Sequence, residues 1–110
     1  MTDNLAFDME LQTLRERTID RLMCADVFDR SAFDALIQYL DRKAADLRKE
    51  PVIPKQVLAC LRDASGAIRS RAEYIQSVKA NVEMANQFDM LLELLIIGET
   101  LSDRKAPRVL

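Results

Sequence analysis

From Lys55 to Ile97 the sequence contains no proline and only one glycine, Gly66. Proline and glycine interrupt helices most strongly, so this segment predicts one long helix of about 65 Å at 1.5 Å per residue. Gly98 follows directly and is well placed to end that helix, because glycine adopts left-handed backbone angles without strain. Such a helix extends beyond any compact partner of ordinary length, which predicts a second copy packed along it.

Two shorter helical segments precede the long one. The first is expected from Asp3 to Met23, where apolar residues recur at steps of three and four. The second is expected to begin at Ser31 as its N-cap and to end before Pro51 and Pro54. Its apolar stripe consists of Phe33, Leu36, Ile37, Leu40, Ala44 and Leu47. The prediction is an all-α fold, a small bundle of two shorter helices and one long C-terminal helix, packed antiparallel as a homodimer.

Composition and charge narrow the setting of this chain. Of its 110 residues 49% are hydrophobic and 31% charged, which is typical of a folded domain, and we expect one helical domain over residues 1–98. Residues 99–110 are polar and basic and are expected to form a flexible tail. The net charge of −2 disfavours direct binding of nucleic acid. The acidic beginning of the chain lacks the features of a signal peptide, and the most apolar stretch, Met90 to Ile97, is too short for a membrane span, so a cytoplasmic protein is expected.

The sequence offers little catalytic chemistry. There is no histidine to activate a serine or cysteine or to complete a zinc site, and no glycine-rich phosphate loop. Cys24 and Cys60 are expected to be reduced thiols. We therefore predict neither a metal nor a cofactor, and a protein that is not an enzyme.

The segment from Met84 to Ile97 is apolar on all sides of the predicted helix, so something must cover each side. Two partners are possible and compatible, a second copy of the chain and a different protein. We assign the dimer interface to one stripe, formed by Val78, Val82, Leu92 and Ile96. We assign the partner-binding surface to a second stripe and to an aromatic anchor in the first helix, namely Met84, Phe88, Leu91, Leu95 and Phe7.

The stretch from Ala80 to Gln87, followed by Phe88 and the leucine-rich run to Ile97, resembles the C-terminal helix of the TraM/QslA-type quorum-sensing antiactivators. These are small, dimeric, all-helical proteins of the cytoplasm. The resemblance implies regulation of transcription by a protein–protein interaction, in which a LuxR-type transcriptional activator is sequestered through its dimerisation or DNA-binding surface. It covers about 25 residues and implies Met84, Phe88, Leu91 and Leu95 as partner contacts.

Two alternatives remain open. The segment from Leu14 to Leu22 resembles the opening helix of all-helical chorismate mutases, in which arginines and a lysine bind the substrate carboxylates and ether oxygen. Arg15 or Arg17, Lys43 and Arg48 would have to perform that role here. The other alternative is a generic helical dimerisation or adaptor module.

Overall fold

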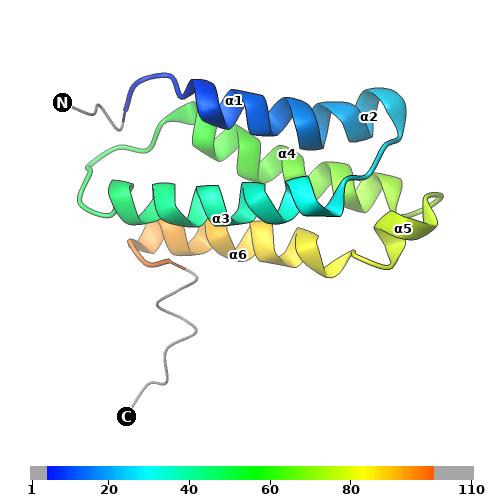
Figure 1. Cartoon of the computed structure of the whole chain (residues 1–110). Coiled ribbons are helices and arrows are strands. Elements are labelled where there is room, and N and C mark those ends of the chain that lie inside the picture. The colour runs from blue at the N-terminus through cyan, green and yellow to red at the C-terminus, as the bar shows by residue number, and fades with distance from the viewer. Residues whose placement is uncertain (1–4, 101–110) are drawn as a thin grey trace, which may run out of the picture.

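The computed structural model describes residues 5–100, and every regular element within that range is a helix (Figure 1). The predicted all-α class is therefore confirmed. The elements are α1 (Met9–Arg15), η1 (Glu16–Asp20), α2 (Arg21–Ala25), α3 (Arg30–Leu47), α4 (Lys55–Arg71), α5 (Gln76–Lys79) and α6 (Glu83–Ile97). No helix of the described residues is long and apolar enough to cross a membrane.

The first three elements follow one another without a break and form a single rod with one π-helical turn, η1, in its middle (Figure 1). This rod begins at Met9, because the side chain of Asp8 caps it by accepting a hydrogen bond from the Leu11 N–H. The predicted start at Asp3 is wrong, since residues 5–8 are not helical, and Asp3 itself lies outside the described residues. The rod ends where Asp26 adopts left-handed angles, with φ of 55°.

Helix α3 has the apolar stripe predicted from the sequence, and all six of its members are buried. Its N-cap differs from the prediction. Asp29, not Ser31, caps the helix by accepting the Ala32 N–H at 3.1 Å. Both residues are good caps, but the carboxylate of Asp29 comes first in the chain, so that Ser31 lies inside the helix.

The predicted long helix from Lys55 to Ile97 is wrong. Helix α4 ends at Arg71, the chain turns at Ile75, and α6 folds back along α4 (Figure 1). This arrangement lets α4 and α6 bury apolar faces against each other within one chain. The end of the segment agrees with the prediction, because Gly98 is the C-cap of α6 with φ of 78°.

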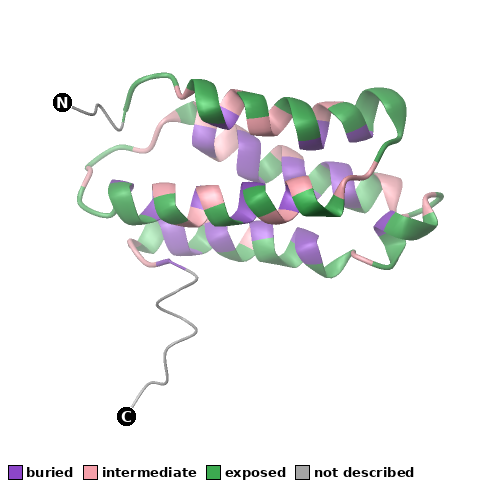
Figure 2. Ribbon diagram, in the orientation of Figure 1, coloured by how far each residue is buried: buried purple, intermediate pink, exposed green. Residues whose placement is uncertain are grey.

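The four long rods form a bundle in which each reverses the direction of the one before it (Figure 1). The rod α1–α2 contacts α3 and α4 on one side, and α6 contacts the same two helices on the other. Helices α3 and α4 consequently lie at opposite corners, and residues 48–54 cross the end of the bundle to join them. Buried residues line the inward sides of all four rods (Figure 2).

Candidate functional site

The side chains assigned to partner binding in α6 lie in the core of this structure. Met84, Phe88, Leu91 and Leu95 are all buried, because this face of α6 fills the cleft between α3 and α4. A partner protein has no access to them while the bundle is closed. Phe7 differs, since it is 63% exposed just before α1.

The four side chains assigned to a dimer interface do not share one surface. Val78 is fully buried, Leu92 is half-buried, and Val82 and Ile96 are exposed. Val78 lies in α5 and Val82 is the N-cap of α6, whereas Leu92 and Ile96 share one face within α6. The interface remains a prediction.

A shallow apolar groove runs between α4 and α6 on the outside of the bundle. It has a volume of about 510 Å³ and is lined by Lys55, Leu58, Ala59, Arg62 and Leu92, which we call the α4/α6 groove. Leu58 and Leu92 are half-buried, so their apolar atoms form its floor. The charged ends of Lys55 and Arg62 are exposed at its rim.

Ile96 extends this apolar surface toward the end of the bundle. It lies four residues after Leu92, so both project from one face of α6. Ile96 is 66% exposed and also lines a cavity of about 230 Å³ beside Pro51 and Ile53. Val52, in the same connection, is 56% exposed. Apolar side chains thus continue from the groove to the loop that joins α3 and α4.

An ion pair also joins α4 to α6, closer to the turn at Ile75 than the groove is. The Arg69 guanidinium contacts Asp89 at 2.7 Å and also donates to Ser65 Oγ and Asn86 Oδ1. Burial acts to raise the pKa of Asp89, but the hydrogen bonds from Arg69 and Ser65 and the charge of Arg69 outweigh it and lower that pKa. Asp89 is therefore ionised at neutral pH and holds Arg69 in place.

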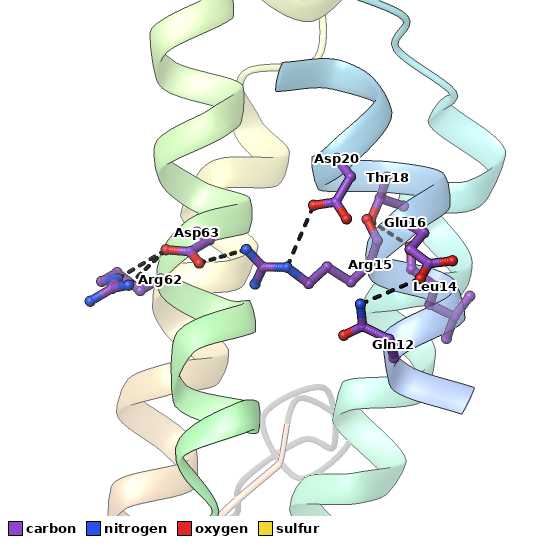
Figure 3. A network of polar contacts seen from close by, with 8 residues as sticks. All are labelled: Gln12, Leu14, Arg15, Glu16, Thr18, Asp20, Arg62 and Asp63. Carbon is purple, nitrogen blue, oxygen red and sulfur yellow. Dashed lines mark hydrogen bonds and ion pairs between the residues drawn. The ribbon is translucent and has the colours of Figure 1, made fainter. Parts of the chain in front are cut away.

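A second polar cluster joins the first rod to α4 (Figure 3). Arg15 reaches from α1 to Asp63 at 2.9 Å and has Asp20 at 3.6 Å, while Arg62 contacts the other oxygen of Asp63. Cavities of about 280 and 380 Å³ flank this contact, and Cys60 lines the smaller one. The charge of Arg15 is balanced by Asp63, so Arg15 does not offer an unpaired positive charge to an anionic substrate in these cavities.

The residues required by a chorismate mutase are spread over separate places. Arg15 pairs with Asp63, whereas Lys43 pairs with Asp8 at 3.2 Å near the beginning of α1. Arg48 lines the small cavity at the end of α6, and Arg17 is exposed. Within residues 5–100 no three potential metal-ligating side chains come together either.

Lys55, Leu58 and Arg62 were not singled out from the sequence, because the expectation of one continuous helix placed α4 and α6 end to end. A signal was present. Asp89 falls on the stripe that runs from Val82 to Leu92, and this charged residue marks the position where the buried face is that of Phe88 and Leu91 instead.

Comparison with known protein families, with curated proteins and with solved structures finds no match.

Proposed function

We propose that this chain is a protein-binding regulator that seats an amphipathic helix of a partner protein in the α4/α6 groove. The observation that carries the proposal is the continuity of apolar surface from the half-buried Leu58 and Leu92 in the groove to the exposed Ile96. Apolar surface of this kind is typical of helix-in-groove recognition, in which side chains one turn apart anchor the partner helix.

The rim of the groove indicates the chemistry of the partner. Lys55 and Arg62 flank the apolar floor, and Arg62 has its side chain 75% exposed although it contacts Asp63. A partner helix with leucine-like side chains on one face and carboxylates beside them would complement this surface. Charges at such a rim contribute to specificity and association rate more than to affinity.

For the class of partner we propose a LuxR-type transcriptional activator in the cytoplasm, sequestered so that it no longer binds its promoter. This part rests on the resemblance of residues 80–97 to the quorum-sensing antiactivators. An activator that dimerises through helices would offer an apolar helix of the required kind, and an inhibitor that covers it competes with self-association.

The test is a gel-shift assay in which the protein is added to a purified LuxR-type activator bound to its promoter DNA. We expect release of the DNA, and we expect Ile96→Glu to weaken that effect at least tenfold. Met90→Glu is the matched control, since Met90 is 49% exposed and lies about 120° around α6 from Ile96, away from the groove.

Two results would contradict this proposal separately. If the wild-type protein leaves activator and DNA bound, the class of partner is wrong. If Ile96→Glu and Met90→Glu inhibit as well as the wild type, the groove is not the binding surface.

A further inference from the structure

The segment that joins α4 to α6, residues 72–82, contains no glycine and no proline. We call it the hinge. Ala72, Ala80 and Val82 have right-handed helical backbone angles, and Ile75 is extended with φ of −108° and ψ of 111°. Nothing in its sequence requires the hinge to bend, in contrast with the proline-containing connection between α3 and α4.

The backbone of the hinge already forms helical turns on both sides of the bend. The Ile75 N–H donates to the Arg71 carbonyl, and the Lys79 N–H donates to the Ile75 carbonyl, both with the spacing of an α-helix. Two changes would convert α4, α5 and α6 into one continuous helix: Ile75 must adopt helical angles, and the turn at residues 80–82, where the Asn81 N–H donates to the Val78 carbonyl with i→i−3 spacing, must relax to α-helical spacing.

Apolar burial and a polar cluster hold the hinge closed. Ala72 and Ile75 are packed against the core, and Arg71 donates to the Met23 carbonyl at 3.0 Å. Val78 is fully buried. The Tyr74 hydroxyl donates to Asp26 at 3.0 Å, and Arg71 contacts the same carboxylate at 3.1 Å. Tyr74 is 61% exposed and Asp26 is also exposed, and pairs at such positions contribute little to stability.

The face of α6 that fills the cleft between α3 and α4 cannot remain in water if the hinge straightens. It carries two leucines, a methionine and Phe88, all buried in the closed chain. A second copy of this chain offers a cleft of identical shape, so the surface that fits α6 best is already specified by the sequence. Exchange of α6 between two copies keeps the contacts that α6 makes in the core and changes those of the hinge, including the burial of Val78.

We propose that this chain forms a domain-swapped dimer in which residues 55–97 become one helix and α6 of each copy fills the cleft between α3 and α4 of the other. The proposal is independent of the function proposed above, because Leu58 and Leu92 come together in either form. In the swapped form they belong to different copies. The buried stripe of Met84, Phe88, Leu91 and Leu95 then forms the contact between subunits.

The substitution Gln76→Pro distinguishes the closed monomer from the swapped dimer. Gln76 is the first residue of α5, where the N–H has no partner within the helix, and Ile75 before it has angles close to those that precede proline. The closed chain therefore accepts this substitution. In a continuous helix the same proline removes a hydrogen bond and clashes with the Ala72 carbonyl. Gln76→Ala, which favours the helix, is the matched control.

The experiment is refolding at high protein concentration, followed by size-exclusion chromatography with light scattering. We expect a dimer for the wild type and for Gln76→Ala. For Gln76→Pro we expect a monomer, with the dissociation constant of the dimer raised about ten-thousandfold, because each of its two long helices would contain one proline and each proline costs about 3 kcal/mol. Circular dichroism establishes that each variant is folded. A wild type that stays monomeric, or a Gln76→Pro variant that dimerises equally well, would overturn the proposal.

A distance measurement distinguishes a swapped dimer from a dimer of closed chains. Spin labels at Lys55→Cys and Ile97→Cys, with Cys24→Ser and Cys60→Ala, lie at the same end of the closed bundle (Figure 1). In the swapped dimer they are separated within one chain by about 63 Å, at 1.5 Å per residue. Labelled chains diluted with unlabelled ones should give the long distance in the dimer fraction, and a short distance there would exclude the exchange.

Discussion

The carboxylate of Asp8 accepts a hydrogen bond from the hydroxyl of Tyr39, which ties the N-cap of α1 to the middle of α3. Lys43, one turn farther along α3, contacts the same oxygen at 3.2 Å, and the Leu11 N–H donates to the other oxygen. Gln56 at the beginning of α4 exchanges two hydrogen bonds with the backbone of Asp8. Three rods of the bundle thus meet at one residue.

Removal of this carboxylate should destabilise the bundle. We expect Asp8→Ala to lower the free energy of unfolding by about 2–4 kcal/mol, because α1 loses its cap and Lys43, with a side chain only 12% exposed, loses its partner. Tyr39→Phe should cost about 1 kcal/mol, the usual contribution of one hydrogen bond. Urea unfolding followed by circular dichroism measures both. Glu10→Ala, at an exposed acid in the same turn, is the control and should change the free energy by less than about 0.5 kcal/mol.

The same residue should make stability depend on pH. Burial acts to raise the pKa of Asp8, but the hydrogen bonds from Tyr39 and the Leu11 N–H and the charge of Lys43 lower it below its ordinary value. A carboxylate with a lowered pKa in the folded state contributes stability that is complete above the unfolded pKa of about 4 and is lost as the pH falls through the folded value. We expect the urea concentration at the unfolding midpoint to decrease as the pH is lowered below about 4, and to decrease less in Asp8→Asn. If the urea midpoint of Asp8→Asn decreases with falling pH as steeply as that of the wild type, the acid sensitivity comes from other carboxylates, such as Asp63.

Phe88 provides a test of its position in the core. Its ring packs edge-to-face against Phe33 of α3, with 6.2 Å between the ring centroids. Phe88→Ala should lower the free energy of unfolding by about 3–5 kcal/mol, through lost burial and the cavity left behind. The same change at the exposed Phe7 should cost less than about 0.5 kcal/mol. If Phe88→Ala retained full stability and only lost a partner, the residue would be a surface contact as the sequence suggested.

The π-helical turn η1 contains a buried threonine whose hydroxyl has a defined role. Thr18 Oγ1 donates to the Leu14 carbonyl at 2.7 Å and is fully buried. Thr18→Val keeps the shape of the side chain but removes this hydrogen bond, and should cost about 1–2 kcal/mol. Thr13 makes the equivalent bond to the Met9 carbonyl at an exposed position, so Thr13→Val is a matched control with a smaller expected loss. Equal losses in thermal unfolding would show that burial does not matter here.

The two cysteines should react at very different rates. Burial raises the pKa of the Cys60 thiol to about 12, and the opposing effect of Arg15 is smaller, whereas Cys24 is exposed. Since the thiolate is the reactive form, we expect Ellman's reagent to modify one thiol rapidly in the folded protein and a second only after unfolding. The Cys24→Ser variant should then show almost no rapid reaction, and a rapid reaction in that variant would mean that Cys60 becomes accessible by opening of the bundle.

The sequence was most informative about features that depend on a few neighbouring residues. The buried stripe of α3 and the glycine cap of α6 could be read directly, because a 3.6-residue period and a left-handed cap are local properties. The bend at Ile75 could not, since its residues are compatible with a helix and the bend is stabilised by tertiary burial of Val78. The error in the long helix therefore also led to an error in topology.

The candidate site also depends on tertiary contacts that the local sequence does not reveal. The pattern of apolar residues singles out Leu92 and Ile96, but as a dimer interface and not as part of a groove. The groove also needs Leu58, which lies 34 positions before Leu92 in the chain and reaches α6 only because of the bend. The pattern of apolar residues assigns Phe88 and Leu91 to a partner-binding surface, because their stripe is one of several on a helix that is apolar on all sides. The choice among those stripes depends on which one faces α3 and α4, and no local signal specifies that.

The position of α6 across from the rod α1–α2 has a consequence for the order in which the protein is made. Helices α3 and α4, which form the cleft for α6, both leave the ribosome before α6 does. A nascent chain that has just completed α4 therefore carries an apolar cleft with nothing in it. That cleft is filled only when α6 has followed, from the same chain in the closed form or from a second copy in the exchange proposed above.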